Sequence, residues 1–205
     1  MNWQERYVEK RSTPDKAVRR ITSGQHVFIS SGAAEPLALV DALVAQADHF
    51  TDTQIVHLLT LGPAPYVELQ YEAHFRHNAF FIGSNVRSAV HAGRADYTPV
   101  FLSQIPALMR SRRMPVDVAL IQCSEPDKFG YVNLGVSVDI GLAAIESAHT
   151  VIAEVNPNVP VIYGAGFLLF DRIDTWVFND APMVTVNPQP IDDVSMEIGR
   201  NVAAL

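Results

Sequence analysis

The residues best suited to bind a ligand follow one strongly apolar stretch of the chain. The apolar run at 116–121 predicts a strand buried on both faces, as in the parallel sheets of α/β proteins. Pro126 ends this strand because proline cannot donate to the ladder, and polar and small residues follow up to position 139. In open α/β sheets ligands bind outside the carboxyl ends of the strands, so we expect a cleft here. The candidate cleft residues are Ser124, Gly130 and Ser137.

A second candidate site follows the predicted strand at 26–30. The small residues at 31–34 form a turn at which a ligand can approach the backbone, and Glu35 comes next. Glu35 is either a residue that starts a helix before Pro36 and shapes the site, or a carboxylate nucleophile. The first interpretation is favoured, because position in a fold alone is weak evidence for catalysis. The candidate substrate-binding residues of this turn are Ser31, Gly32 and Glu35.

Three further residues could contact a ligand from the segment after the third predicted strand. Asn85 lies where a helix at 84–91 is predicted to open, and Arg87 could hold an anion there with two hydrogen bonds. A solvated surface arginine is an equally good interpretation of Arg87. Tyr97 could close over a bound ligand, although an aromatic residue before a proline-containing segment is as often simple packing.

Other reactive side chains give weaker signals, and we assign no catalytic residue. His57 lies inside an apolar strand, which favours a hydrogen-bonded core histidine over an acid or base. Cys123 has no basic partner nearby in sequence, and Glu125 and Asp127 are typical turn residues. We expect no metal site, because no spacing of histidines suggests one, and no dinucleotide or ATP site, because the glycine-rich loops are missing.

Composition indicates a single cytoplasmic enzyme domain. The chain has 205 residues, 48% hydrophobic content and one cysteine, which suits a reducing compartment. The amino terminus is charged and lacks an apolar signal core, and no apolar run reaches the roughly 20 residues of a membrane helix. The net charge of −7 argues against nucleic acid as a partner.

The alternation of helical and extended patterns predicts an α/β fold with an open, mostly parallel sheet flanked by helices. We expect residues 1–190 to form the α/β domain, and residues 191–205 to form a helix leading toward a second α/β domain absent from this chain. Thr13 and Pro14 open a helix that extends to about position 22, and Pro106 falls in the first turn of a helix at 103–113. The predicted strands lie at 26–30, 54–60, 79–83, 116–121, 131–134, 151–155, 161–163 and 176–178.

Apolar side chains are also unusually frequent at 161–170 and 176–178 for a segment of loops and short strands. They either complete the local core or form an interface with a partner.

Several blocks of sequence carry a family resemblance over nearly the whole chain, in one order and without a large gap. These blocks resemble the amino-terminal half of the acetyl-CoA hydrolase/transferase family, and within it the 4-hydroxybutyrate CoA-transferases. The blocks are Ser31 to Pro36, His57 to Tyr66, Phe80 to Arg87, Gly93 to Pro99, Asp117 to Asp139, and Val155 to Pro157.

The resemblance implies acetate metabolism, with an acyl-CoA thioester and a small carboxylic acid as substrates and no permanently bound cofactor. It also implies a complementary carboxyl-terminal domain, whose glutamate forms a glutamyl-CoA thioester, and a homo-oligomer. This chain alone is then inactive. Two alternatives stay open: an acyl-CoA hydrolase, in which water replaces the acceptor acid, and a non-catalytic module of the same fold that binds a ligand or partner.

Overall fold

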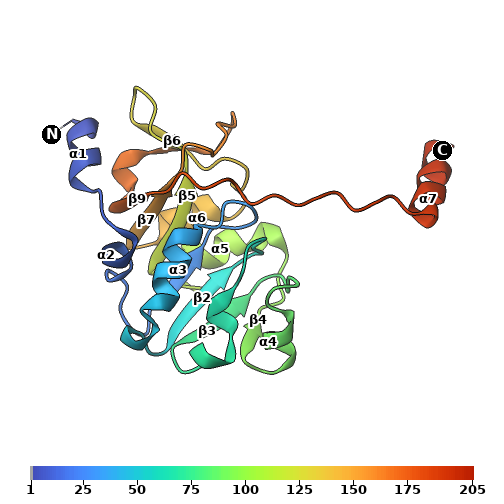
Figure 1. Ribbon diagram of the computed structural model, residues 1–205, viewed down its shortest axis with the longest axis horizontal. Helices are drawn as coiled ribbons and strands as arrows, with labels where there is room; N and C mark the ends of the chain where they lie inside the picture. Colours follow the sequence, from blue (N-terminus) through green and yellow to red (C-terminus); the bar gives the residue numbers. More distant parts are fainter. Residues whose placement is uncertain (1) are drawn as a thin grey trace.

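A parallel β-sheet lies at the centre of the computed structural model, which describes residues 2–205 (Figure 1). Seven strands run in the order β4-β3-β2-β1-β5-β7-β9, and each neighbouring pair is parallel. The strands are β1 His26–Ile29, β2 Thr53–His57, β3 Phe75–Ala79, β4 Ala95–Tyr97, β5 Val118–Cys123, β7 Thr150–Val155 and β9 Thr175–Phe178. A separate antiparallel pair consists of β6 Tyr131–Asn133 and β8 Phe167–Leu169.

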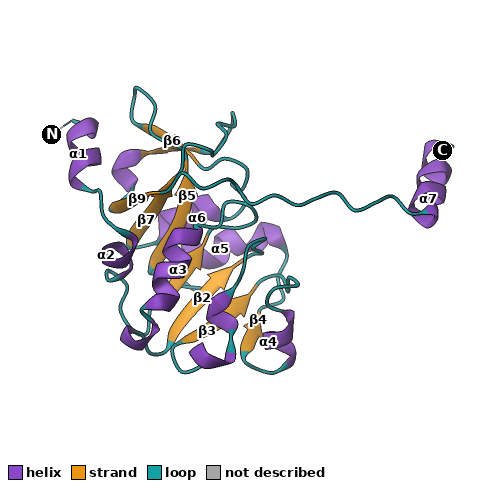
Figure 2. Ribbon diagram, viewed as in Figure 1, coloured by secondary structure: helices purple, strands orange, loops and turns teal. Residues whose placement is uncertain are grey.

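Helices flank both faces of the sheet (Figure 2). The α-helices are α1 Trp3–Glu9, α2 Pro14–Val18, α3 Leu37–Ala45, α4 Arg87–His91, α5 Ile105–Arg110, α6 Gly141–Ser147 and α7 Asp193–Ala203. Short 3-10 turns are η1 Ala47–His49, η2 Pro65–Val67, η3 Leu69–Tyr71, η4 Leu102–Gln104 and η5 Phe170–Arg172. The predicted α/β class with an open parallel sheet is confirmed.

Alternating side chains of the strands divide the interior into two cores. In β1, Val27 and Ile29 pack with α2 and α3, whereas Phe28 packs with α5 and α6 on the opposite face. All six residues of β5 are buried, since this strand is covered on both faces. The unbroken apolar run at 116–121 therefore predicted the central strand correctly.

Two helix starts follow their sequence signals. The Thr13 side chain accepts a hydrogen bond from Lys16 N, and Pro14 opens α2, although the helix already ends at Val18. Pro106 lies in the first turn of α5, where a missing N–H costs no helical hydrogen bond.

Two predicted strands are wrong. The third strand is β3 at Phe75–Ala79, and the apolar residues after Ala79 form a loop instead. Residues 161–163 are irregular and exposed, whereas the nearby strand β8 begins at Phe167. We missed β3 because its polar residues interrupt the apolar pattern by which strands are predicted.

The expected apolar surface near the carboxyl end divides into two groups. Phe170 and Trp176 are buried, and the Tyr7 ring of α1 stacks on Trp176 with centroids 4.1 Å apart. They complete the local core. Leu168 and Val177 are buried as well, whereas the exposed large apolar side chains of this region are Val161, Ile162, Tyr163, Leu169 and Phe178.

Helix α7 lies apart from the α/β body, at the end of an extended segment (Figure 1). Asp192 caps it by accepting a hydrogen bond from Ser195 N at 2.7 Å. None of its residues is buried, and Val194, Ile198 and Val202 are each more than half exposed. The predicted helix at the carboxyl end is present, with an apolar stripe that no residue of 2–205 covers.

Gly130 makes close contacts with distant parts of the chain. It has a φ of 86°, and a Cβ atom added there would lie 2.8 Å from the Cγ of Trp3 in α1. Its amide donates to Asp127 O, and its carbonyl accepts from Phe170 N. Gly130 thus forms a tight turn packed against an indole ring, which is a structural role, and its place in a ligand site stays a prediction.

We therefore expect Gly130→Ala to destabilise the fold more than Gly24→Ala. Gly24 has a similar φ of 79° but open space around its Cα, so both alanines cost about 1–2 kcal/mol of backbone strain. Gly130→Ala should cost a further 1–3 kcal/mol, approximately, because it overpacks Trp3. Urea unfolding of both variants measures the difference, and in a Trp3→Ala background the excess should vanish. Equal destabilisation of the two glycine variants would contradict the contact.

Candidate functional site

The turns after β1 and β2 meet at the carboxyl edge of the sheet. Gly32 forms a parallel bridge with Thr60, and its amide donates to Leu59 O at 2.6 Å. Its φ of 60° favours glycine. A Cβ atom on Gly32 would also lie 2.7 Å from Ser137 Oγ, so the loop that follows β6 reaches the same place. The structure therefore brings the predicted residues Gly32 and Ser137 together.

Glu35 joins the ends of three strands. Its carbonyl accepts a hydrogen bond from Gln122 Nε2 of β5 at 2.8 Å, and its Oε2 accepts from Gly62 N after β2 at 3.0 Å. A Cβ atom on Gly62 would lie 2.5 Å from that carboxyl oxygen. Glu35 itself is 0% exposed. It cannot touch a ligand in this conformation, which favours the site-shaping role over substrate contact or nucleophilic attack.

Asn85 holds the same segment from the β3 side. Its side-chain amide donates to Thr60 O at 3.3 Å, to Thr60 Oγ1 at 2.9 Å and to Gly62 O at 2.9 Å. The two backbone carbonyls can only accept, so they fix which end of the amide points at the loop. Asn85 and Glu35 together clamp residues 60–62.

Burial keeps the Glu35 carboxyl protonated near neutral pH. Loss of solvent raises its pKa to about 8, an effect opposed by the Gly62 N–H bond and reinforced by the negative charges of Asp41 and Glu154. Within residues 2–205, neither Glu35 Oε1 nor the hydroxyl of buried Tyr66 has a hydrogen-bond partner. A neutral, enclosed acid is a poor nucleophile.

Glu154 of β7 occupies the start of α3. Its Oε2 accepts from Ala38 N at 2.9 Å and from Leu39 N at 3.3 Å, and its Oε1 accepts from Asn179 Nδ2 at 2.7 Å. Burial raises its pKa. These bonds use the amides that could otherwise bind a ligand anion at the helix N-terminus. Our sequence analysis missed this residue, although a glutamate inside the apolar segment 151–155 was the available signal.

The His57 ring is buried, as predicted. The hydrogen bond that we expected for it is missing among the residues that the structure describes. Neither ring nitrogen has a partner within residues 2–205, and the ring stacks on His77 with centroids 4.1 Å apart. His77 Nδ1 donates to Ile55 O at 3.0 Å. Burial lowers the pKa of both rings, so both are neutral.

We call Gly32, Glu35, Asn85 and Ser137 the Glu35 cluster. Other predicted residues make their contacts elsewhere. Ser124 ties β5 to β6, since its Oγ accepts from Asn133 N and donates to Glu125 O, each at 2.9 Å. Asp127 has the expected turn role, accepting from the amides of residues 129 and 131. Cys123 is buried, which raises its thiol pKa. Ser31 is buried in the turn after β1.

Arg87 and Tyr97 are both exposed. Arg87 is the first residue of the short helix α4, and Tyr97 ends the edge strand β4. Their side chains make no hydrogen bond within the described part of the chain, so the structure does not join them to the Glu35 cluster.

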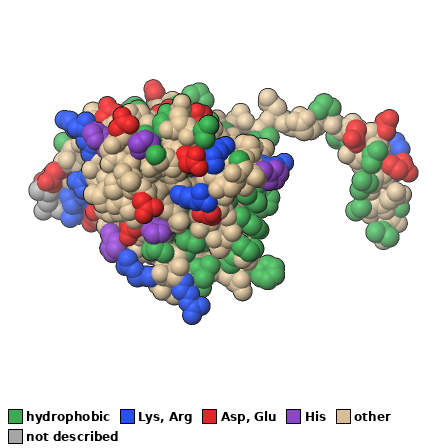
Figure 3. All heavy atoms as spheres, turned by 90° about the horizontal axis from the view of Figure 1, so that it is seen from below, with side chains coloured by type: hydrophobic (Ala, Val, Ile, Leu, Met, Phe, Trp, Pro, Cys, Tyr) green, Lys and Arg blue, Asp and Glu red, His purple; other side chains and the backbone are tan. Residues whose placement is uncertain are grey.

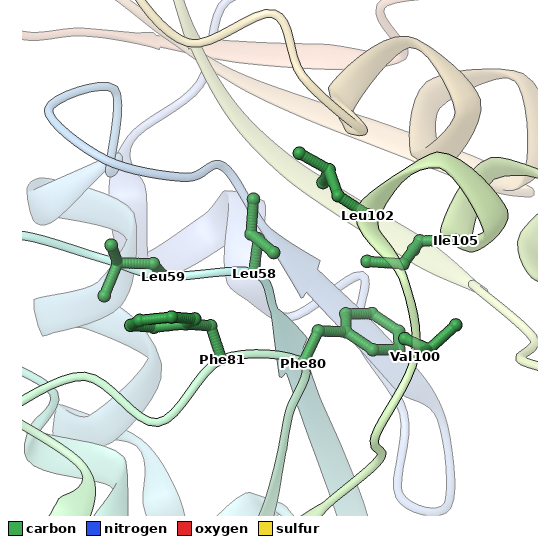
Figure 4. A pocket seen from close by; sticks show the side chains of 7 residues that line it. All are labelled: Leu58, Leu59, Phe80, Phe81, Val100, Leu102 and Ile105. Carbon is green, nitrogen blue, oxygen red and sulfur yellow. The ribbon is translucent and has the colours of Figure 1, made fainter.

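An apolar groove of about 270 Å³ opens beside this edge (Figure 4). Segments that follow β2, β3 and β4 supply its walls, and α5 supplies one more side chain. The lining residues are Leu58, Leu59, Phe80, Phe81, Val100, Leu102 and Ile105.

No helix within residues 2–205 is both long and apolar enough to cross a bilayer. In the same residues, no group of three or more His, Cys, Asp and Glu is placed to hold a metal ion.

Comparison with known proteins identifies the family. Residues 1–188 match the family model of the acetyl-CoA hydrolase/transferase N-terminal domain. The chain belongs to this family.

Curated relatives in the family are CoA transferases. The chain is 45% identical to the 4-hydroxybutyrate coenzyme A transferase of Clostridium kluyveri, over 100% of this chain and 48% of that protein. It is 36% identical to the succinyl-CoA:acetate/propanoyl-CoA:succinate CoA transferase of Fasciola hepatica, over 97% of this chain and 41% of that protein. The chain therefore spans about half the length of the curated relatives it matches.

Solved structures share the fold. RipA from Yersinia pestis superposes with a TM-score of 0.92 at 26% identity, over 100% of this chain and 50% of that one. The 4-hydroxybutyrate CoA-transferase from Porphyromonas gingivalis gives a TM-score of 0.83 at 28% identity, over 99% and 47%.

The Glu35 carboxyl makes stability depend on pH. The folded chain keeps its proton up to about pH 8, whereas an exposed glutamic acid releases it near 4.5, so the stability it contributes falls as pH rises through this range. The lowered pKa values of His57 and His77 make stability rise with pH instead, and only below about pH 6.5. We expect the free energy of unfolding to fall by about 1 kcal/mol between pH 7 and 8, because the folded carboxyl loses about half of its proton over this interval.

Glu35→Gln should flatten this decline, because its amide is neutral at every pH. Urea unfolding at half-unit pH intervals measures it, with the exposed Glu72→Gln as the control for loss of one negative charge. Parallel decline in the wild type and in Glu35→Gln would show that the carboxyl is not held neutral.

Proposed function

We propose that this chain is the amino-terminal half of an acyl-CoA:carboxylate CoA-transferase of the acetyl-CoA/4-hydroxybutyrate type. The observation that carries the proposal is 45% identity, over all 205 residues, to half of a 4-hydroxybutyrate coenzyme A transferase. In the proposed enzyme the chain forms one wall of the cleft, and a complementary half supplies the nucleophilic glutamate.

The proposed reaction passes CoA through that glutamate. Its carboxylate attacks the thioester carbonyl, giving a mixed anhydride and CoA thiolate. The thiolate then attacks the glutamyl carbonyl of the anhydride, which releases the first carboxylate and leaves a glutamyl-CoA thioester. The acceptor carboxylate reverses these steps and leaves as the new acyl-CoA. Each anhydride must be kept from water.

Three acidic side chains near the carboxyl edge make structural contacts within this chain. Glu35 is buried and neutral near pH 7, and Glu154 is buried with three donors on its carboxylate. Asp127 closes a turn. Neither buried glutamate can approach a thioester, and the Asp127 carboxylate is engaged by two backbone amides, which supports placing the nucleophile in the other half.

What this chain offers to a substrate is a small, close-fitting surface. Gly32 and Ser137 are partly exposed where the loops after β1 and β6 meet. The lack of a side chain on Gly32 lets a ligand approach the backbone. Glu35 and Asn85 hold the loops behind this surface, so they act as positioning residues.

We expect the 205-residue chain alone not to transfer CoA, because Glu35 and Glu154 are buried and the proposed nucleophile belongs to the other half. Joined to the second half of the Clostridium kluyveri relative, it should transfer CoA from acetyl-CoA to 4-hydroxybutyrate. Chromatographic detection of 4-hydroxybutyryl-CoA measures both samples.

Two results would count against the proposal. Transfer at enzyme-like rates by the chain alone would place the nucleophile here. Release of free CoA by the joined protein at the same rate with and without 4-hydroxybutyrate would instead identify a hydrolase.

A further inference from the structure

We propose that Glu35, Thr60 and Tyr66 form a buried hydrogen-bond relay whose direction reverses when the Glu35 carboxyl ionises. We call these three side chains the hydroxyl relay. It holds the turn at 60–62 in both protonation states, which makes Thr60 and Tyr66 positioning residues for the surface around Gly32. The relay itself is independent of the proposed function, and only its effect on CoA transfer rests on that proposal.

The three side chains lie in the interior behind the carboxyl edge. Glu35 is 0% exposed, Tyr66 1% and Thr60 2%. The Thr60 hydroxyl acts on both neighbours, because it opposes the rise in pKa that burial causes at Glu35 and at Tyr66. Neither approach has full hydrogen-bond geometry, so Glu35 Oε1 and the Tyr66 hydroxyl have no partner within residues 2–205. Buried polar atoms are costly unless they are paired, and closing these two contacts pairs both.

Asn85 limits what the Thr60 hydroxyl can offer. The side-chain nitrogen of Asn85 can only donate, so at 2.9 Å it occupies one acceptor position of Thr60 Oγ1. A hydroxyl has one hydrogen to donate and two positions that accept, so one of each remains. Glu35 and Tyr66 are the two neighbours that still need a partner. Thr60 can therefore donate to one of them and accept from the other.

The proton on Glu35 decides which way the relay runs. Oε2 of Glu35 already accepts from Gly62 N at 3.0 Å, so the proton of the neutral acid lies on Oε1. The neutral acid donates to Thr60 Oγ1, and Thr60 then donates to the Tyr66 hydroxyl. The ionised carboxylate can only accept, so Thr60 turns its hydrogen to Glu35 and accepts from Tyr66. Rotation of O–H bonds is sufficient for this reversal.

The charged groups around Glu35 offer no substitute for the relay. Asp41 of α3 and Glu154 of β7 are the charged side chains that face it, and both make its ionisation harder. Lysine and arginine side chains stand on the outside of the molecule in the view of Figure 3, and none within residues 2–205 pairs with Glu35. The Thr60 hydroxyl is therefore the donor through which the ionised form can be held.

Tyr66 also lies beside the stacked rings of His57 and His77. The centroids of these rings are 6.0 Å and 5.8 Å from that of Tyr66. Burial lowers the pKa of both histidines, so neither changes its charge near pH 8, where Glu35 ionises. A change at Tyr66 near pH 8 therefore reports on Glu35 and not on a histidine.

The relay bears on the surface that the proposed function assigns to the substrate. Thr60 bridges Gly32, the Gly32 amide donates to Leu59 O at 2.6 Å, and Leu61 N donates to Gly32 O at 3.2 Å. An ionised Glu35 without donors would draw water into the turn at 60–62 and open it. With the relay in place, Gly32 keeps its position on both sides of the pH at which Glu35 ionises.

NMR titration of the 205-residue chain tests the relay without requiring catalysis. Glutamate labelled at Cδ and tyrosine labelled at Cζ report on Glu35 and Tyr66, and the variants Glu35→Gln and Tyr66→Phe assign the signals. We expect the Glu35 signal to titrate near pH 8. The Tyr66 signal should move at the same pH, and it should not move in Glu35→Gln.

Paired variants separate the relay from simple charge repulsion. Thr60→Val removes the hydroxyl, so the pH at which Glu35 titrates should rise by about one unit, the size of one hydrogen bond to an ionised group, and the response of Tyr66 should be lost. Thr60→Ser keeps the hydroxyl and should restore both. Tyr66→Phe should also raise the titration midpoint of Glu35, but by less. Tyr71→Phe removes the same atom from a half-buried ring of η3 and should leave the midpoint unchanged.

The inference is overturned if Tyr66 does not respond to Glu35. It is also overturned if Tyr66 responds equally in Thr60→Val and Thr60→Ser, because charge alone, or a buried water, would then link the two side chains.

The positioning role is tested in the protein joined to the second half of the Clostridium kluyveri relative. Thr60→Val should lower kcat/KM for CoA transfer about tenfold, because small displacements of a substrate surface are costly, and Thr60→Ser should restore it. An unchanged kcat/KM in Thr60→Val would refute the positioning role. Coupled titrations in a joined protein that transfers no CoA would refute the proposed function and leave the relay. Transfer with uncoupled titrations would refute the relay and leave the function.

Discussion

The hydrogen bond from Gly62 N–H to the buried Glu35 carboxyl is the contact on which the carboxyl edge depends. In a parallel sheet the strands are paired along their length, but beyond β1 and β2 this pairing continues only as an isolated bridge between Gly32 and Thr60. Glu35 aligns these strand ends further, because its carboxyl binds the turn after β2 and its carbonyl accepts from Gln122 of β5. The Gly32–Thr60 bridge and the Asn85 hydrogen bonds hold the same turn after β2.

Placing an acid there has a cost that its protonation reduces. An ionised carboxylate without water or a cation would be strongly destabilising, whereas the neutral acid loses only one polar group's hydration. Burial raises the pKa of Glu154 too, but three N–H donors contact its oxygens and oppose that effect. The two glutamates therefore hold the carboxyl edge through different sets of hydrogen bonds. Both are buried and unavailable to a substrate.

Local signals in the sequence were sufficient for the central strand and several helix starts, and insufficient where distant contacts decide. β5, the Thr13 cap and Pro106 in α5 needed only neighbouring residues. β3 was missed because Arg76 and His77 are polar; the strand accommodates them through the Arg76–Asp96 ion pair and the stack on His57.

The same limit applies to the candidate site. Gly32, Glu35, Asn85 and Ser137 were each singled out from sequence, but only the strand order brings their loops together, and the sequence does not state that order. The structural role of Gly130 could not be predicted because its contact, Trp3, is over one hundred residues away in the chain. The helix that carries Trp3 had a readable signal that we missed, the reciprocal capping of Asn2 and Glu5.

The side chains at the carboxyl edge indicate which tasks this half would perform in a two-half enzyme. Glu35 and Glu154 are buried there, whereas Gly32, Ser137 and part of the apolar groove are open to solvent. Such a surface can shape a cleft and keep it dry, but it cannot attack a thioester. Hydrolysis and transfer differ only in whether water reaches the intermediate, so the choice between them depends on how closely a facing half covers this edge. The apolar rim around the groove therefore bears on the reaction as well as on assembly, because the closer the fit over Phe81 and Leu102, the less water can compete with the acceptor acid.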